Sequence, residues 1–95
     1  MTQPPNIARR LVITGRVQGV GFRFAFADEA SERQLRGWVR NRRDGSVEAI
    51  VAGTLADVEA MIAWARRGPP AARVAAVSVE TVDEAFERFD IAPTV

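Results

Sequence analysis

Residues 35–53 read Leu-Arg-Gly-Trp-Val-Arg-Asn-Arg-Arg-Asp-Gly-Ser-Val-Glu-Ala-Ile-Val-Ala-Gly, two β-rich runs on either side of a polar turn. The turn at residues 43–46 contains Asp-Gly, a strong signal for a chain reversal between two strands. The flanking runs are rich in β-branched and aromatic residues, which favour strands. We therefore expect a β-hairpin with strands over residues 35–42 and 47–53.

The segment before the hairpin, residues 22–34, fits two periods. Phe22, Phe24 and Phe26 alternate as in a strand, whereas Phe22, Phe26 and Ala30 recur every four residues as on one face of a helix. The Ala, Asp and Glu residues in the segment favour a helix. We therefore expect a helix over residues 22–34.

The segments after the hairpin predict a second helix and two more strands. Thr54 and Asp57 form an N-terminal capping pair, and the Gly-Pro-Pro at residues 68–70 ends the helix that begins there. A Val-rich strand follows over residues 73–82, and a short last strand contains Phe89 and Ile91.

A β-rich run over residues 9–17 supplies the first strand, so the predicted order is βαββαβ plus a short C-terminal strand. This is an α+β ferredoxin-like sandwich, with two helices on one face of an antiparallel sheet. The 95 residues leave room for one domain. We place it at residues 9–95, after a flexible N-terminal tail at residues 1–8.

The composition narrows the class of protein. Apolar residues make up 47% of the chain and charged residues 26%, a balance typical of a globular domain. No apolar run approaches the roughly 18 residues of a membrane span, and the N-terminus does not read as a signal peptide. The net charge of +1 gives no general case for nucleic-acid binding. We therefore expect a cytoplasmic monomer without a membrane or nucleic-acid partner.

The segment Gly15–Arg23 has the features of an anion-binding loop between a strand and a helix. Gly19 and Gly21 permit backbone angles that let successive N–H groups point at one anion, and Val20 adds no competing polar group. Arg23 supplies a planar, permanently charged fork for phosphate oxygens. A tight turn followed by a surface arginine would have the same sequence, so the residues alone leave both interpretations open.

The absence of Cys, His and Lys limits the chemistry of such a site. No Ser or Thr lies in the loop to form a phospho-enzyme, and no carboxylate cluster suggests a metal pair, so we expect no metal or cofactor. Direct attack of water on a phosphoryl group with a good leaving group remains, and an acyl phosphate has such a group. Asn41, on the same strand face as Val39, could orient the water. The alternative is that Asn41 helps to shape the turn at residues 43–46, and the residues alone favour that role.

Two blocks carry a family resemblance. Residues 17–23 (Val-Gln-Gly-Val-Gly-Phe-Arg) and residues 37–41 (Gly-Trp-Val-Arg-Asn), followed by Asp-Gly-Ser-Val-Glu at residues 44–48, resemble the acylphosphatase signature, within a likeness that spans residues 9–92. The resemblance implies metal-independent hydrolysis of a small-molecule acyl phosphate to a carboxylate and inorganic phosphate. It implies that Asn41 orients the attacking water. The substrate-binding residues expected on this basis are Gln18, Gly19, Val20, Gly21, Phe22 and Arg23.

The chain departs from the family at the end of the first helix, where Arg33-Gln34 replaces the usual Leu-Gly. The missing glycine should weaken a left-handed helix end by about 1 kcal/mol. Two other functions stay open as alternatives. Acylphosphatase-like domains occur as modules of larger carbamoyl-transfer proteins, although we expect a separate enzyme because the chain ends at Val95. RNA binding is the second alternative. Sheets that bind RNA carry exposed aromatic residues on their central strands, and residues 47–53 carry none.

Overall fold

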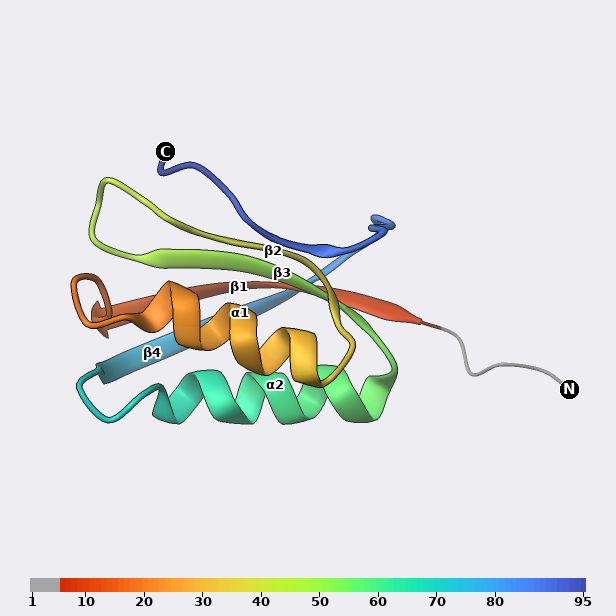
Figure 1. Cartoon of the computed structure of the whole chain (residues 1–95), viewed down its shortest axis with the longest axis horizontal. Helices are drawn as coiled ribbons and strands as arrows, with labels where there is room; N and C mark the ends of the chain where they lie inside the picture. The colour runs from red at the N-terminus through yellow and green to blue at the C-terminus, as the bar shows by residue number, and fades with distance from the viewer. Residues whose placement is uncertain (1–5) are drawn as a thin grey trace, which may run out of the picture.

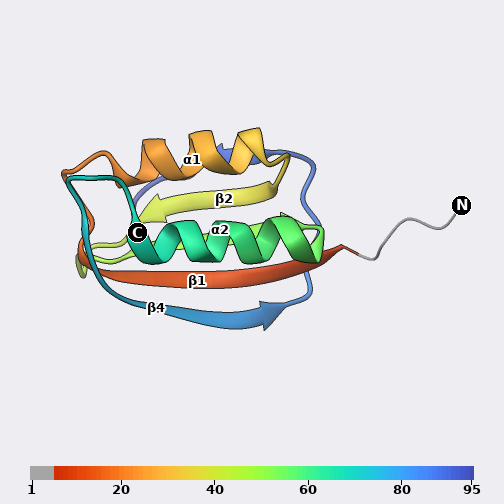
Figure 2. The ribbon, with the colours of Figure 1, turned by 90° about the horizontal axis from the view of Figure 1, so that it is seen from below.

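The computed structural model describes residues 6–95, which form a two-layer sandwich with both helices on one face of the sheet (Figures 1 and 2). The predicted α+β ferredoxin-like fold is therefore confirmed. The elements in chain order are β1 (Ile7–Arg16), α1 (Phe22–Glu32), β2 (Arg36–Asn41), β3 (Val47–Gly53), α2 (Leu55–Arg67), β4 (Arg73–Val82) and β5 (Phe89–Ile91).

The described strands form one five-stranded sheet in the order β4-β1-β3-β2-β5. β4, β1, β3 and β2 pair antiparallel, as expected, but β5 pairs parallel with β2. The sheet is therefore mixed, and the prediction of an entirely antiparallel sheet was wrong at this edge. The chain path explains the difference, because β4 ends at the same end of the sheet at which β2 begins (Figure 2). The strand that returns from there must run in the direction of β2.

The start of the first strand and the end of the first helix differ from their predicted positions. Ile7 and Ala8, assigned to the tail, belong to β1, because they pair with the end of β3. Residues 1–5 of the predicted tail lie outside the described residues. Helix α1 ends at Glu32, two residues before its predicted end, and Gln34 then adopts a left-handed φ of 57°. A residue with a side chain thus takes the conformation that glycine adopts most easily.

The main core lies between the helices and the sheet. Phe22 and Phe26 of α1 are buried and pack against Trp64 of α2, with ring centroids 5.7 and 5.8 Å from that of Trp64. This contact fixes the first turn of α1 against the second helix. Trp64 therefore serves packing between the two helices.

The opposite face of the sheet carries an ion triad. Buried Glu48 of β3 accepts hydrogen bonds from Arg10 Nε at 2.6 Å and from Arg40 Nε at 2.8 Å. Burial raises the pKa of Glu48, but the hydrogen bonds and charges of Arg40 and Arg10 outweigh it and lower that pKa overall. Arg40 also lies 4.4 Å above the ring of Trp38. The arginine at position 40 is therefore paired within the sheet.

Candidate active site

Three segments meet at one end of the sandwich. The loop after β1, the first turn of α1 and the end of β2 lie together, beside the β2–β3 turn (Figure 1). They enclose a small cavity of about 140 Å³. It is lined by Val17, Gln18, Gly19, Gly21, Phe22, Arg23, Phe24 and Asn41. The structure therefore brings Arg23 and Asn41, which are 18 positions apart in the sequence, to one place.

The loop over residues 17–21 owes its shape to two glycines. Gly19 has a φ of 74° and Gly21 a φ of 78°, both in the left-handed region. A Cβ atom added at either position would meet no described atom within 4 Å. The backbone angle, and not lack of space, requires glycine here. The volume in front of both residues is left open for a bound group.

Helix α1 begins without a side-chain cap. Gly21 occupies the N-cap position, and no side chain in residues 6–95 accepts a hydrogen bond from the first N–H groups of the helix. The first turn also contains no acidic residue. The first N–H groups of a helix carry partial positive charge and lack partners within the helix. The start of α1 therefore presents free donors to the cavity.

Arg23 adds a full positive charge to this helix start. Its side chain is half-buried and forms no ion pair with the described part of the chain. Its guanidinium carbon lies 5.6 Å from the ring centre of Phe24, the next residue. A guanidinium in this position can bind two oxygens of one phosphate.

Asn41 is the last residue of β2 and lines the cavity beside the loop. Its side-chain Oδ1 is buried and has no hydrogen-bond partner among residues 6–95. A buried polar atom without a partner costs about 1–3 kcal/mol. The backbone of Asn41 is fixed, because its carbonyl accepts from the N–H of Val95 at 3.2 Å. Asn41 therefore lines the cavity and carries a buried acceptor whose hydrogen-bonding capacity residues 6–95 leave unused.

Gln18 has a role that the sequence did not indicate. Its Nε2 donates to the carbonyls of Arg42 at 2.7 Å and Ser46 at 2.8 Å, at the two ends of the β2–β3 turn. The side chain expected to bind substrate thus ties the loop to the turn beside Asn41. Only the backbone of Gln18 remains available to an anion. Sequence analysis missed this contact because its partners are 24 and 28 residues away.

The remaining predicted site residues have simpler positions. Val20 packs against the core and does not line the cavity with its side chain, and Phe22 is buried beneath it. Asp44 accepts hydrogen bonds from the side chain and backbone N–H of Ser46, which hold the pKa of its carboxyl below the ordinary value. Asp44 is therefore an ionised turn residue, as expected, and not a base.

Residues 6–95 lack two features, a cluster of metal-binding side chains and a helix that could span a membrane. No three His, Cys, Asp or Glu side chains gather where they could hold a metal ion. No helix in that range is long and apolar enough to span a bilayer. The chemistry available at the cavity therefore comes from backbone N–H groups, one guanidinium and one amide.

Comparison with known proteins identifies a consistent set of relatives. The sequence model of the family described as acylphosphatase matches residues 9–91. A protein named acylphosphatase from Cupriavidus necator is 51% identical over 86 residues, which cover 90% of this chain and 94% of that protein. The structure of an acylphosphatase from Coxiella burnetii matches with a TM-score of 0.91 at 34% identity, covering 97% of this chain and 100% of that chain.

A further likeness is to part of a longer protein. The structure of full-length HypF in its phosphate- and nucleotide-bound form matches with a TM-score of 0.88 at 31% identity. The match covers 98% of this chain and 13% of the HypF chain. The same fold therefore occurs both in small proteins of this length and as one part of a larger chain.

Proposed function

The chain belongs to the acylphosphatase family, enzymes that hydrolyse phosphorus-containing acid anhydrides, and on that basis we propose that it hydrolyses acyl phosphates. The products are a carboxylate and inorganic phosphate. The observation that carries the proposal is Asn41, which lines the same cavity as the glycine loop and Arg23 and whose buried Oδ1 has no hydrogen-bond partner among residues 6–95.

Substrate binding depends on the loop and the start of α1. The phosphoryl group sits against the N–H groups after Gly19 and Gly21, where the helix dipole favours negative charge. Arg23 neutralises charge on the equatorial oxygens. In a loose phosphoryl-transfer transition state, negative charge is spread over the three equatorial oxygens of the phosphoryl group. Positioning of the reactants and stabilisation of this charge therefore supply most of the catalysis.

The attacking water is held by Asn41. Oδ1 accepts a hydrogen bond from the water, which directs a lone pair of the water oxygen at phosphorus. The new P–O bond forms as the bond from phosphorus to the acyl oxygen breaks, and the carboxylate leaves with that electron pair. The protons of the water stay on the phosphate product as dihydrogen phosphate, so no side chain has to accept one. The good leaving group makes a general acid unnecessary.

The proposal extends to the working state of the protein. We propose that the enzyme is active as a monomer. The donors at the cavity are protein groups, which supports activity without metal or cofactor. We place the enzyme in the cytoplasm and assign it no nucleic-acid partner.

The first experiment is a hydrolysis assay with benzoyl phosphate in the presence of EDTA. Wild type should turn over the substrate, and inorganic phosphate should inhibit competitively. Absence of turnover, or loss of turnover on adding EDTA, would contradict the proposal.

Asn41→Ala tests the role of the amide. The kcat should fall about a hundredfold or more, by comparison with loss of one preorganised catalytic group, while inhibition by phosphate stays similar. Asn6→Ala is the matched control, because Asn6 lines a cavity at the other end of the molecule. A large loss of phosphate affinity with kcat intact would refute the role of Asn41 in holding water.

A further inference from the structure

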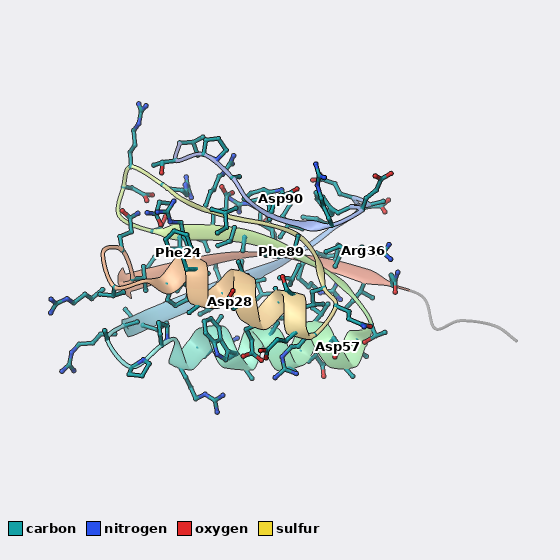
Figure 3. All side chains as sticks on the ribbon, in the orientation of Figure 1. Phe24, Asp28, Arg36, Asp57, Phe89 and Asp90 are labelled. Carbon is teal, nitrogen blue, oxygen red and sulfur yellow. The ribbon has the colours of Figure 1, made fainter. Side chains whose placement is uncertain are left out.

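Phe24 is a large aromatic residue left in solvent at the edge of the active-site cavity. Its side chain lines the cavity, yet the residue is 62% exposed. Figure 3 shows it on the first turn of α1, near the loop that precedes the helix. Helical spacing directs Phe22 and Phe26 into the core and places Phe24 away from it.

The fold does not account for this aromatic ring. Phe24 belongs to neither cluster of core residues. Within the described chain, its ring lies near the guanidinium of Arg23, at 5.6 Å. A phenylalanine left in water forgoes the stabilisation of burial. An alanine here would suit the helix better. A role at the cavity explains the residue better than a role in stability.

Among the described residues that line the cavity, Phe24 is the one with an exposed apolar side chain. Val17 and Phe22 are buried beneath the cavity, and its glycines have no side chains. The side chain of Gln18 is held by the β2–β3 turn. The two remaining groups, Arg23 and Asn41, are polar. Among the described lining residues, Phe24 therefore offers the exposed apolar surface.

The size of the cavity limits how much of a substrate it can hold. A volume of about 140 Å³ has room for a phosphoryl group and a water, but not for a bulky acyl group as well. With phosphate against the loop, the acyl portion must project through the mouth, past Phe24. Arg23 lies over the ring of Phe24, and the exposed surface of the ring remains free for a flat group to stack.

We propose that Phe24 is the acyl-group contact of this enzyme and selects acyl phosphates with an aromatic or bulky apolar acyl group over those with a small one. The inference rests on the proposed function and adds a substrate preference to it. Stacking buries ring surface only when the acyl group is large enough to reach it. A methyl group held at the carbonyl is too short to cover the ring.

The test compares benzoyl phosphate with acetyl phosphate in wild type, Phe24→Ala and Phe24→Leu. In Phe24→Ala the ratio of kcat/KM for benzoyl to that for acetyl phosphate should fall about fivefold, a typical loss for one partly buried apolar contact. Phe24→Leu should lie between the two. The control is Leu55→Ala, which removes another exposed apolar side chain at the start of α2 and should leave the ratio unchanged. Inhibition by inorganic phosphate should differ little in Phe24→Ala.

Three outcomes would overturn the inference in distinguishable ways. An unchanged substrate ratio in an active Phe24→Ala enzyme would overturn it alone and leave the proposed function standing. Equal losses for both substrates, with weaker phosphate inhibition, would show that Phe24 acts by positioning Arg23 and not by contacting the acyl group. Hydrolysis of neither substrate by wild type would overturn the proposed function and this inference together.

Discussion

The two helices of this protein begin in opposite ways. Helix α2 starts after Thr54, whose Oγ1 accepts from the N–H of Asp57 at 3.2 Å and lies 3.0 Å from the carboxylate of that residue. Helix α1 starts after Gly21, without a side-chain cap in the described chain and without an acidic residue in its first turn. In both helices the first N–H groups have no partner within the helix, and the helix dipole makes this end partly positive.

The difference separates a helix start that the protein caps with its own side chain from one that we propose binds the substrate. At α2 the hydroxyl of Thr54 accepts from the backbone N–H of Asp57, and the Asp57 carboxylate, which accepts from that hydroxyl, adds a negative charge in the first turn. At α1 the protein leaves the first N–H groups open, adds the charge of Arg23, and places the acceptor of Asn41 beside them. An external phosphate can therefore do at α1 what Thr54 and Asp57 do at α2.

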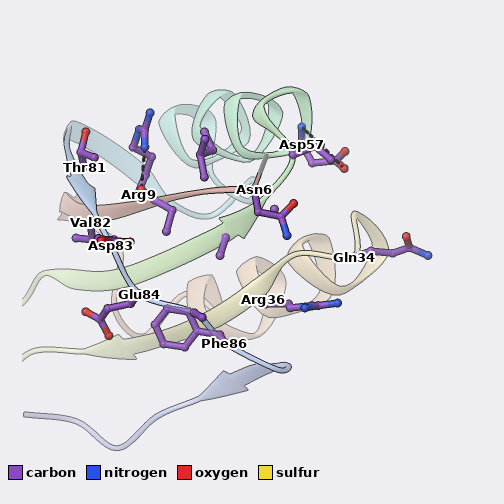
Figure 4. A pocket seen from close by; sticks show the side chains of 16 residues that line it. Asn6, Arg9, Gln34, Arg36, Asp57, Thr81, Val82, Asp83, Glu84 and Phe86 are labelled. Atoms are coloured by element: carbon purple, nitrogen blue, oxygen red, sulfur yellow. Dashed lines mark hydrogen bonds between the residues drawn. The ribbon is translucent and has the colours of Figure 1, made fainter. Parts of the chain in front are cut away.

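Cavity size alone would point to the other end of the molecule. A larger hollow of about 700 Å³ lies at the end where α2 begins, and Thr54 lines it. Figure 4 shows Gln34, Asp57 and Glu84 there, extending in different directions and not toward one point. The smaller cavity is distinguished by the convergence of donors and an unpartnered acceptor.

The largest effect should come from removing the charge at the start of α1. Arg23→Gln should lower kcat/KM for an acyl phosphate about a thousandfold, since it removes a charged bidentate contact to the transferred group. The melting temperature should change little, because Arg23 forms no ion pair with residues 6–95. Arg66→Gln, in the last turn of α2, is the matched control and should keep activity. Activity of Arg23→Gln within tenfold of wild type would contradict the contrast between the helices.

A smaller loss should follow when the loop is released from the β2–β3 turn. Gln18→Ala removes two part-buried hydrogen bonds, to the carbonyls of Arg42 and Ser46, and should cost about 2 kcal/mol of unfolding free energy. The kcat should also fall about tenfold, since misplaced groups lose catalytic alignment. Denaturant unfolding and steady-state kinetics measure the two effects. Gln18→Glu keeps the shape but not the donor, so wild-type behaviour of that variant would refute the role.

The capped helix predicts the reverse pattern of effects. Thr54→Ala should lower the unfolding free energy by about 1 kcal/mol, the usual value of an N-cap, and leave kcat and KM unchanged. Thr54→Ser retains the hydroxyl and should restore most of the stability. Denaturant unfolding compared with the hydrolysis assay separates the two quantities. A change in kinetics beyond twofold would show that α2 is coupled to the site.

The smallest effect concerns the other ends of the same helices. Helix α2 is followed directly by Gly68 with a φ of 68°, whereas α1 is followed by Arg33 and then by Gln34 at a φ of 57°. Gln34→Gly should raise the unfolding free energy by about 0.5 kcal/mol, because the relief of left-handed strain exceeds the added entropy of the unfolded chain. Gln34→Ala should give no gain. An unchanged or lower stability of Gln34→Gly would show that the left-handed position carries no strain.

Much of the fold was predictable because its signals are local. The Asp-Gly turn predicted the hairpin of β2 and β3, and the Thr54–Asp57 pair predicted the start of α2. The ambiguous segment from Phe22 onward was assigned correctly to a helix, because its four-residue spacing matches the residues that are buried. Each of these patterns depends on neighbours within a few positions.

Local patterns in the sequence predicted the element order, the glycine loop and the two candidate site residues, Arg23 and Asn41. Backbone preferences and hydrophobic periodicity act over short segments, so they can be read without a structure. The tertiary structure alone decided the parallel pairing of β5, the bonds of Gln18 to the turn and the isolation of Asn41 Oδ1. These depend on the path of the chain and on contacts between distant residues. No local pattern specifies which distant carbonyl a glutamine will meet, or which buried acceptor will be left without a partner.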